Sequence, residues 1–460
     1  MSGFSKLPLS ENLLQNLRLL AYTQPTAIQQ EAIPFILAGK DVAAQAETGS
    51  GKTATYGLPI LQHIDGNVQQ VQALVIVPTR ELATQVREEL KRLGKHIQSL
   101  KISAVYGGHS FSEEEKSFRH PPQILIATPG RLLDHLRRNT VTLQTVEKLV
   151  IDEADKLLEM NFEEELNQLL AFLPKKRQSL LFSATLPDKV KMLISQTLVT
   201  PVFIQAGEQA NPEQISFIAY KVPHLQKVTA LLQLLAMLGQ PRAVIFCNTR
   251  ERVEEVAQQL NKKGLTAEAL HGAMEQLNRD KALLKFKNGS AGLLVATDLA
   301  ARGIHIAALG TVIHLEILRE QASFLHRSGR TGRAGAEGNV YVLLSPEEEG
   351  YMQKWSQDVH LQWKKLDTSA PAQARNLSEV HTPEFLTLHI KAGKKEKISP
   401  RDIVGAIMAE AGLSASEIGK IEVHDHYSYV AVPYTQGKDI LDKLNTGKIK
   451  GRKIRVTVVK

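Results

Sequence analysis

The sequence contains one cysteine and no long apolar run, and each shortage excludes a class of protein. Cys247 follows the apolar run Ala243–Phe246, so no disulfide framework is possible and we expect the thiol to be a small core residue. Nowhere do as many as ~18 apolar residues run together, and the first residues, Met1–Lys6, lack the apolar core of a signal peptide. We therefore expect a soluble, cytoplasmic protein with no membrane partner.

The histidines are scattered and form no spacing typical of a metal-ligand cluster. What the chain has is length and positive charge. Its 460 residues, 43% of them hydrophobic, suggest roughly three domains. The formal net charge of +8 favours an anionic partner, although a diffuse excess of lysine also serves solubility. The position of the charge decides between these two interpretations.

Short apolar runs alternate with longer amphipathic stretches from about residue 25 to residue 345, a pattern typical of parallel strands joined by helices. We predict a first set of strands at residues 41–45, 73–77, 102–106, 124–127, 149–152 and 180–182. A second set is predicted at residues 243–247, 266–270, 293–296, 311–315 and 339–344. The polar, turn-rich segment 205–212 between the sets indicates a linker joining two α/β domains.

A tail of a different kind follows the polar stretch 367–383. Strands are predicted at residues 387–390, 418–423, 428–432 and 453–458, and helices at residues 400–411 and 438–444. The order βαββαβ is that of a small ferredoxin-like α+β domain, the class that includes RRM RNA-binding modules. Residues 385–460 contain 14 Lys and Arg against 8 Asp and Glu, a net charge of +6, so most of the excess charge lies here.

Two basic clusters, residues 393–398 and 448–455, flank this small domain. They are either RNA contacts or solvated faces. Tyr427 and Tyr429 fall on one face of the third predicted strand, where they are either stacking platforms for bases or ordinary core and surface tyrosines.

A glycine-rich segment, Ala46–Thr53, follows the first predicted strand. Backbone N–H groups of such a loop cradle phosphates, Lys52 is expected to reach the terminal phosphates, and the Thr53 hydroxyl is expected to hold Mg²⁺. The generic pattern has glycine where this chain has Ala46, but the preceding strand and the Lys-Thr pair support a nucleotide loop. We predict ATP and Mg²⁺ as cofactors.

Two carboxylates, Asp152 and Glu153, come at the end of the apolar strand 149–152. The alternative is a solvated acidic helix start, since Asp and Glu are favoured there. A strand end in an open α/β sheet is, however, where ligands bind. We therefore predict that Asp152 binds Mg²⁺ through water and that Glu153 orients or deprotonates the attacking water, with Lys52 as the third catalytic residue.

In order and spacing these segments resemble the DEAD-box RNA helicases over nearly all of residues 4–346. Further segments carry the resemblance, among them Tyr22–Gln29, Pro78–Ala83, Thr128–Arg131 and Ser183–Thr185. The resemblance implies two tandem RecA-like parallel-sheet domains. It implies nucleotide contacts from Phe4, Gln29, Thr48, Gly49, Ser50, Gly51, Lys52 and Thr53. It also implies RNA contacts from Pro78, Thr79, Arg80, Gly108, Thr128, Pro129, Gly130, Arg131, Gln276, Arg279 and Thr297.

The segment His326–Arg333 resembles the family's arginine-finger motif and supplies Arg330 and Arg333 as catalytic cations; otherwise it is a plain phosphate or RNA patch. If these arginines act on the nucleotide, hydrolysis requires the two domains to close. One residue departs from the family pattern: His305 stands where an aspartate usually helps to hold the ribose. We expect weaker nucleotide affinity or altered coupling from His305, without loss of activity.

The tail resembles the carboxyl-terminal domain of the DEAD-box protein A type of bacterial helicases. From the two basic clusters we expect RNA contacts at Lys394, Lys395, Lys450 and Arg452. The resemblance implies anchoring to a hairpin of 23S ribosomal RNA on pre-50S particles. The expected domains are residues 1–207, 208–366 and 385–460, with a linker at 367–384, in a monomer. The expected function is ATP-dependent unwinding of short RNA duplexes. An ATP-gated RNA clamp with little unwinding is the alternative, and the RNA-type tail disfavours a DNA-translocating ATPase.

Overall fold

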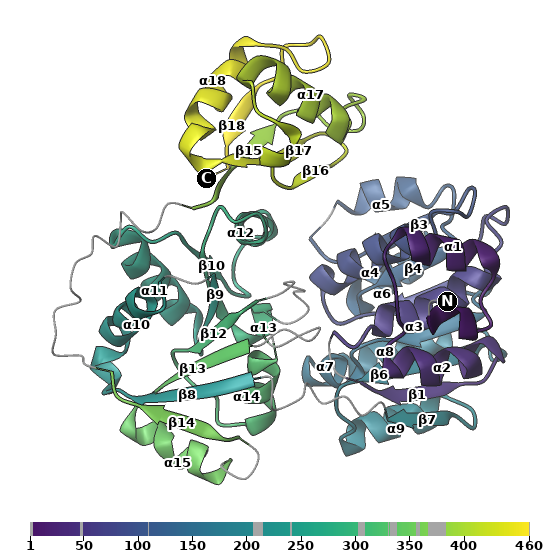
Figure 1. Cartoon of the computed structure of the whole chain (residues 1–460). Coiled ribbons are helices and arrows are strands. Elements are labelled where there is room, and N and C mark those ends of the chain that lie inside the picture. The colour runs from purple at the N-terminus through teal and green to yellow at the C-terminus, as the bar shows by residue number, and fades with distance from the viewer. Residues whose placement is uncertain are drawn as a thin grey trace. The chain divides into compact units, whose positions relative to one another are not determined.

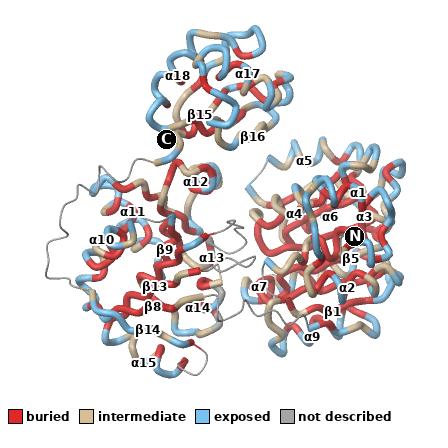
Figure 2. The backbone as a smooth tube through the Cα atoms, in the orientation of Figure 1, coloured by how far each residue is buried: buried red, intermediate tan, exposed pale blue. Residues whose placement is uncertain are grey.

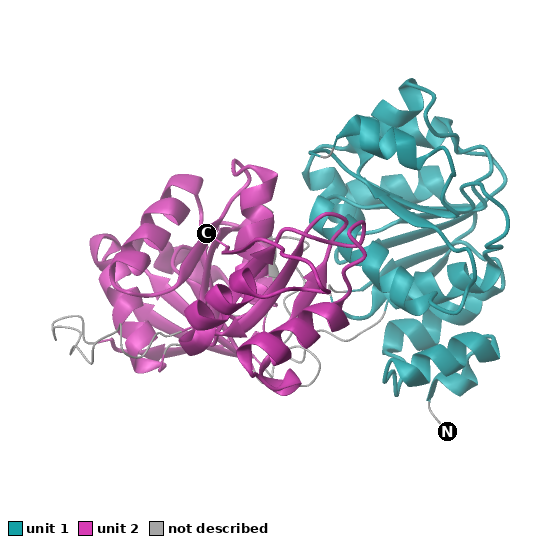
Figure 3. Cartoon of the chain, turned by 90° about the horizontal axis from the view of Figure 1, so that it is seen from above, with its two compact units in different colours: residues 1–209, 303–305 teal, residues 210–302, 306–460 magenta. Residues whose placement is uncertain are grey.

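The protein is described by a computed structural model that covers residues 3–46, 49–108, 110–205, 215–239, 242–301, 309–329, 331, 338–355, 359–366 and 383–459. The chain divides into two compact units (Figure 3). The first takes in the described residues up to Gln205 and the second those from Ile215 onward. The predicted fold class is confirmed, because two seven-stranded parallel sheets are followed by a four-stranded antiparallel sheet (Figure 1).

The first sheet has the strand order β3-β4-β2-β5-β6-β1-β7, with every neighbouring pair parallel. Its strands are β1 (Val42–Gln45), β2 (Ala73–Ile76), β3 (Ile102–Val105), β4 (Ile124–Ala127), β5 (Lys148–Ile151), β6 (Gln178–Ser183) and β7 (Val202–Gln205). The helices are α1 (Glu11–Leu19), α2 (Ala27–Leu37), α3 (Lys52–His63), α4 (Arg80–Leu93), α5 (Phe111–Ser117), α6 (Pro129–Arg137), α7 (Ala154–Glu159), α8 (Glu163–Ala171) and α9 (Asp188–Thr197).

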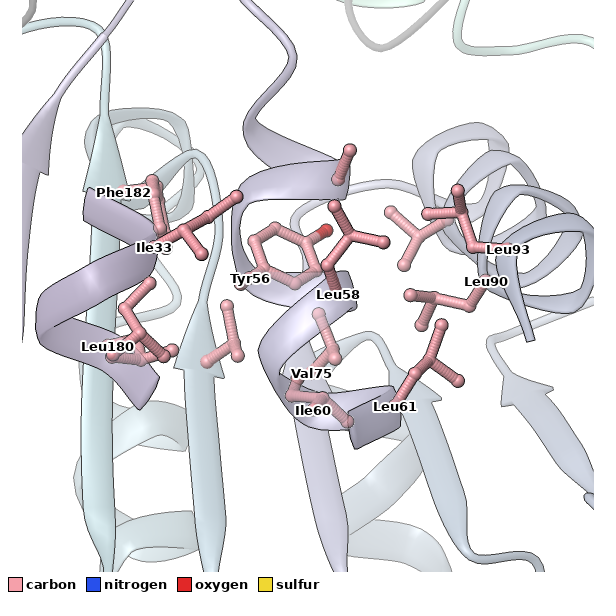
Figure 4. Close-up of a cluster of buried hydrophobic side chains, with 14 of the residues drawn as sticks. Ile33, Tyr56, Leu58, Ile60, Leu61, Val75, Leu90, Leu93, Leu180 and Phe182 are labelled. Carbon is pink, nitrogen blue, oxygen red and sulfur yellow. The ribbon is translucent and has the colours of Figure 1, made fainter. Parts of the chain in front are cut away.

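Helices cover both faces of this sheet, so its strands are buried on both sides (Figure 2). Neighbouring strand residues belong to opposite cores: Val75 packs with α2, α3 and α4, whereas Leu74 and Ile76 pack with the helices of the other face. Figure 4 shows α3 in the first of these cores, with Tyr56 between Ile33 and Leu58. The nearly continuous apolar runs by which the strands were predicted therefore reflect burial on both faces.

The second sheet has the order β10-β11-β9-β12-β13-β8-β14. Its strands are β8 (Ile215–Lys221), β9 (Ala243–Cys247), β10 (Ala267–Leu270), β11 (Leu293–Thr297), β12 (Thr311–His314), β13 (Gly338–Leu344) and β14 (Leu361–Lys364). The helices of this part are α10 (Lys227–Met237), α11 (Arg250–Lys262), α12 (Gln276–Lys287), α13 (Asp298–Ala301), α14 (Gln321–Ser328) and α15 (Pro346–Lys354). Cys247 is confirmed as a core residue, and burial raises the pKa of its thiol to about 12.

The tail has the predicted order βαββαβ and the sheet order β16-β17-β15-β18. Its elements are β15 (Phe385–Ile390), α17 (Pro400–Ala411), β16 (Ile421–Val423), β17 (Ser428–Pro433), α18 (Gly437–Thr446) and β18 (Val456–Val458). Ser399 caps α17 by accepting a hydrogen bond from the Asp402 amide, and the Asp402 side chain bonds back to the Ser399 amide. A single core of residues from both helices and the sheet holds this domain together.

Three strands were not predicted from the sequence: β7, β8 and β14. β7 and β14 each have four residues and lie at sheet edges, where one side of the strand has no partner and the side chains stay partly exposed. β8 is central, but Ser216 and Lys221 interrupt the apolar run by which other central strands were recognised. Among the described residues, helices that combine the length and apolar character needed to cross a membrane are absent.

Candidate functional site

The predicted site residues of the first unit follow the carboxyl ends of neighbouring strands in one sheet. Gly108 comes after β3, the segment 128–131 after β4, the segment 78–80 after β2, the segment 152–153 after β5, and the segment 49–53 after β1. Because the strands are parallel, all these ends lie along a single edge of the sheet, where open α/β sheets bind ligands. The residues predicted to bind the nucleotide lie at β5, β6 and β1, which we call the nucleotide half, and those predicted to bind RNA lie at β3, β4 and β2, which we call the RNA half.

The phosphate loop has backbone conformations that glycine adopts readily. Gly49 and Gly51 have φ values of +98° and +91°, in a region that side chains disfavour. A Cβ atom at Gly51 would lie 2.4 Å from Gln29 Nε2, so glycine is required there for space as well. Lys52 begins α3, and the N-terminus of this helix of 12 residues is a favourable site for phosphate. Thr48 lies outside the described residues.

Two polar side chains at the start of α2 are bonded to this loop. The Thr26 hydroxyl donates to the carbonyl oxygen of Ser50 at 2.7 Å, and Gln29 Nε2 donates to the carbonyl oxygen of Gly51 at 3.2 Å. The Gln29 side-chain oxygen accepts from the Thr26 amide at 3.0 Å, which completes a capping box. Gln29 thus sits against the phosphate loop, as a nucleotide contact requires. Phe4 is a core residue that packs edge-to-face on Tyr22, and its nucleotide contact stays a prediction.

The carboxylate of Asp152 is buried, with 2% of the residue exposed. The Tyr56 hydroxyl donates to its Oδ2 at 3.0 Å and the Glu153 amide donates to its Oδ1 at 2.9 Å. Burial raises the pKa of Asp152; Lys52 opposes the rise, and the neighbouring Glu153 adds to it. Burial, followed by the charge of Asp152, in turn raises the pKa of Tyr56 well above its ordinary value, so the hydroxyl keeps its proton and donates.

Glu153 has a left-handed backbone, with φ 53° and ψ 51°, and lies immediately before α7. This conformation is uncommon for a residue other than glycine. The Lys156 ammonium lies 2.8 Å from Glu153 Oε1, and both side chains are 3% exposed. The candidate base is therefore held by an internal cation one turn along α7.

Asp155 connects the carboxylate segment to the end of β6. Its amide donates to Ser183 Oγ at 3.1 Å, and its Oδ2 accepts from both the amide and the hydroxyl of Thr185 at 3.0 Å. These bonds hold the segment 183–185 against the start of α7.

The RNA half presents the N-termini of two helices. Thr79 caps α4 by accepting from the Leu82 amide at 3.2 Å, and Thr128 is the N-cap residue of α6, followed by Pro129 and Gly130. Because β2 and β4 are adjacent, these two N-termini lie side by side, and each is a favourable site for phosphate. Pro78 precedes the cap of α4.

Arg80, in the first turn of α4, lies across the turn after β3. A Cβ atom at Gly108, where φ is +97°, would lie 2.2 Å from Arg80 Nη1. The glycine therefore allows the guanidinium to lie directly on the backbone of the turn. Arg131, in the first turn of α6, pairs with Glu114 of α5 at 2.7 Å.

In the second unit, Gln276 and Arg279 share the first turn of α12, and Thr297 ends β11. Arg327, which is 1% exposed, donates to the carbonyl oxygen of Glu316 and to Asn248 Oδ1, at 3.1 and 3.2 Å. It also lies 3.5 Å from Asp298. Arg327 thus joins the ends of β9, β11 and β12 to α14. Arg330, Arg333 and His305 lie outside the described residues.

The two basic clusters of the tail meet in space. Lys394 and Lys395 are exposed in the segment after β15, and Lys450 and Arg452 are exposed in the turn before β18. Lys450 Nζ donates to the carbonyl oxygen of Lys397 at 2.6 Å, which joins the two segments. The turn that carries Lys450 and Arg452 therefore lies against the segment that carries Lys394 and Lys395, and Lys450 also pairs with Asp402 in the first turn of α17.

Tyr427 and Tyr429 lie together with His389 and His424, with ring centroids between 4.6 and 5.8 Å apart. The Lys394 amide donates to the carbonyl oxygen of His424 at 2.8 Å, so this aromatic group adjoins the first basic cluster.

Three residues that matter to the site were not predicted: Tyr56, Glu114 and Arg327. Tyr56 lies on the second turn of α3, one helical turn after Lys52, and that spacing was a usable signal. Glu114 and Arg327 depend on pairings with other elements, for which the sequence alone carries no signal.

The oxygens near the phosphate loop suit magnesium. Asp152 supplies a carboxylate and Thr53 a hydroxyl, and Mg²⁺ prefers oxygen ligands while keeping several of its waters. Thr53 lies in the first turn of α3, on the turn that also approaches the Tyr56 hydroxyl. Within the described ranges, clusters of three or more His, Cys, Asp or Glu with metal-binding geometry are absent. An ion held chiefly by phosphates and water needs no such cluster.

Each of the three parts of the chain is similar to a known protein family. Residues 26–193 match the family described as DEAD/DEAH box helicase, residues 226–335 the helicase conserved C-terminal domain, and residues 387–458 the DbpA RNA binding domain.

Two relatives match along the whole chain. The chain is 41% identical to the ATP-dependent RNA helicase DbpA of Escherichia coli K12, with 100% of both chains covered. It is 33% identical to the ATP-dependent RNA helicase DbpA of Bacillus subtilis 168, with 99% of both covered. Among solved structures it is similar to the DEAD-box helicase Mss116 bound to single-stranded RNA and UDP-BeF, with a TM-score of 0.72 and 27% identity over 89% of this chain and 87% of that chain.

Proposed function

The chain belongs to the DbpA-type DEAD-box ATP-dependent RNA helicases, and on this premise we propose that it locally separates short duplexes of 23S ribosomal RNA during assembly of the large ribosomal subunit. The similarity of the tail to the DbpA RNA binding domain supports an RNA target chosen by the tail. We propose domain boundaries at residues 1–207, 208–366 and 385–460, a linker at 367–384, and action as a monomer on pre-50S particles.

One observation carries the proposal. A single edge of the first sheet holds the phosphate loop and the carboxylates beside the two helix N-termini and Arg80 of the RNA half. The bonds from Asp155 to Ser183 and Thr185 lie within the nucleotide half and fix its loops to each other. The predicted nucleotide and RNA contacts therefore share one edge of one sheet, so a change at the nucleotide occurs next to the predicted RNA contacts.

In the proposed ATP site, Lys52 and the N-terminus of α3 bind the terminal phosphates, and Thr53 and Asp152 hold Mg²⁺. A magnesium ion held there would supply neutralisation of the phosphate charge. Glu153 orients the attacking water and accepts its proton. Gln29 reads the base, with Phe4 nearby, and Gly49, Ser50, Gly51 and Thr48 contribute loop contacts.

The second helicase part supplies the remaining groups. Arg330 and Arg333 are proposed to stabilise the charge on the phosphoryl group during transfer, since planar guanidinium groups match phosphate oxygens. Gln276, Arg279 and Thr297 are proposed to hold the RNA backbone from this part. Hydrolysis then requires ATP and RNA to bring both parts together.

RNA choice is assigned to the tail, because backbone contacts fix position without reading sequence. Lys394, Lys395, Lys450 and Arg452 are exposed, and the two segments that carry them lie against each other, as an anchor for an RNA hairpin requires. The small domain has its own core, so its removal leaves the cores of the two parallel sheets intact.

Crosslinking the full-length protein to cellular RNA and mapping the sites tests the target. We expect crosslinks concentrated at one hairpin of 23S ribosomal RNA, and dispersed crosslinks would refute the ribosomal target. In parallel, a variant without residues 385–460 is expected to lose discrimination between that hairpin and unrelated RNA while keeping its turnover at saturating RNA. Equal discrimination by the shortened protein would refute the anchor.

Unwinding of a short duplex beside steady-state ATP hydrolysis tests the reaction. We expect RNA-stimulated hydrolysis accompanied by strand separation. RNA-stimulated hydrolysis without strand separation would indicate an ATP-gated clamp in place of a helicase. Stimulation by DNA alone would indicate a DNA-dependent ATPase.

A further inference from the structure

Helix α5 is held to the first unit by an unusual set of contacts. None of its seven residues is buried, so none belongs to the hydrophobic core. Instead, Glu114 Oε2 accepts two hydrogen bonds from α6, from Arg131 Nε at 2.7 Å and from His135 Nε2 at 2.9 Å. Since an ionised carboxylate only accepts, both nitrogens are donors in this arrangement. One oxygen of α5 therefore joins two side chains that are one turn apart on α6.

The pair is mostly shielded from water, with 11% of the Glu114 side chain and 12% of the Arg131 side chain exposed. His135 is fully buried. Burial alone would raise the pKa of Glu114, but the hydrogen bonds from His135 and Arg131 outweigh it and hold that pKa below its ordinary value. The carboxylate is therefore charged at neutral pH and is a strong acceptor.

Phe111, at the start of α5, completes the arrangement. Its ring stacks on His135 with centroids 4.4 Å apart and an interplanar angle of 16°. The guanidinium carbons of Arg131 and Arg138 lie 5.0 and 4.3 Å from the centroid of the same ring. The guanidinium of Arg131 is thus fixed by a hydrogen bond and by a ring face, two restraints of different physical kind.

We propose that Glu114 is a positioning residue for RNA binding: with Phe111 it fixes the guanidinium of Arg131, a residue of the first turn of α6. The inference rests on the proposed RNA contact of Arg131. Glu114 uses the inner Nε–H of the guanidinium, and the terminal amino groups carry its other donors. A phosphate at the N-terminus of α6 then meets a preoriented fork, so less side-chain entropy is lost on binding.

The direction in which Glu114→Gln changes the affinity for RNA distinguishes a positioning role from a purely electrostatic one. RNA is a polyanion, so a carboxylate beside a phosphate contact opposes binding through its charge. If charge were its only effect, replacing Glu114 by glutamine would tighten RNA binding. If Glu114 positions Arg131, the same replacement weakens binding, because the guanidinium loses its strongest restraint.

The test uses the full-length protein and a single-stranded oligouridylate as RNA, so that no hairpin occupies the tail. RNA-stimulated ATP hydrolysis is measured against RNA concentration for Glu114→Gln, Arg131→Ala, the double variant, and Glu115→Gln as a matched control. Glu115 is an exposed carboxylate on the same helix, so the control removes the same charge without the contact.

We expect Glu114→Gln to raise the half-saturating RNA concentration about three- to tenfold, the effect of weakening one charge-assisted contact. Turnover at saturating RNA should stay within about twofold, which also shows that the variant folds. Arg131→Ala should weaken binding at least as much, and the double variant no further, because the two residues act as one unit. Glu115→Gln should leave binding equal or slightly tighter.

Two outcomes overturn the inference and are distinguishable. If Arg131→Ala weakens binding while Glu114→Gln leaves it unchanged or tightens it, Glu114 does not position Arg131, although the RNA contact stands. If Arg131→Ala has no effect, the proposed RNA contact itself is wrong and the inference falls with it. Should Glu114→Gln unfold in a thermal scan, Phe111→Leu, which removes the ring and keeps the ion pair, is measured in its place with the same expected direction.

Discussion

Tyr56→Phe is the change that most directly tests the environment of Asp152. Tyr56 is fully buried, and its hydroxyl is one of two donors to the Asp152 carboxylate, at 3.0 Å. Phenylalanine keeps the ring in the core shown in Figure 4 and removes only the oxygen. The effect on ATP hydrolysis therefore reports on this hydrogen bond and on the contact of the same hydroxyl with Thr53.

The magnitude follows from what the hydroxyl does to the ionised carboxylate. A hydrogen bond to a charged group contributes about 1.5–3 kcal/mol, and part of that is recovered if water enters after the change. About 1.4 kcal/mol corresponds to one pKa unit. The pKa of Asp152 is already raised by burial, and Tyr56 opposes that rise. We therefore expect the substitution to move the pKa of Asp152 upward by about one further unit.

The assay is the pH dependence of kcat/KM for MgATP at saturating RNA, because this ratio reports ionisations of the protein before ATP binds. The acid limb of the profile should move about one pH unit toward neutrality in Tyr56→Phe. Tyr341→Phe removes the hydroxyl of a buried tyrosine in the second sheet and serves as the control. If the acid limb of Tyr56→Phe coincides with that of the unchanged protein, the hydroxyl does not stabilise the Asp152 charge.

Three further predictions concern other parts of the chain. Gly108 has a φ of +97°, and a Cβ atom there would lie 2.2 Å from Arg80 Nη1. Gly108→Ala should therefore displace that guanidinium and weaken RNA binding about tenfold, as measured by fluorescence anisotropy. Unchanged binding would exclude Arg80 as a contact. The imidazole of His424, 3.8 Å away, and a neighbouring lysine lower the pKa of Glu422 to about 2. Because the folded-state pKa is depressed, this carboxylate stabilises the tail above its ordinary pKa of 4.5, and the contribution disappears as the pH falls toward 2. Amide exchange in β17 should therefore distinguish Glu422→Gln from the unchanged protein at pH 7 and much less at pH 3. His305→Asp should lower the KM for ATP about threefold, as expected for one added hydrogen bond; equal affinity and equal RNA-stimulated turnover would contradict this.

The nucleotide half of the site was predictable because its chemistry is encoded locally. An apolar strand followed by glycines and Lys52, or by Asp152 and Glu153, specifies both the edge of the sheet and the ligand in one short segment. The antiparallel tail was predictable for a similar reason, since its alternation of strands and helices has few solutions. The observed order of its elements agrees with the prediction.

The pairings that were not predicted join residues far apart in the sequence. Tyr56 and Asp152 are 96 residues apart, and Arg327 and Asn248 are 79 apart. Their proximity depends on the order of strands in the sheet, which local patterns do not specify. The basic clusters of the tail are a similar case, because the bond from Lys450 to Lys397 joins segments that are 53 residues apart. The sequence predicted two separate basic clusters, whereas the fold brings their two segments into contact.

The ion pair of Glu153 with Lys156 bears on the rate of ATP hydrolysis when no RNA is present. A carboxylate that is buried against an ammonium 2.8 Å away is a poor proton acceptor, because taking a proton would leave the lysine as an isolated buried cation. Activation of water by Glu153 therefore requires this pair to loosen or to be compensated by new charge. If Glu153 is the base, this ion pair limits ATP hydrolysis until the pair loosens.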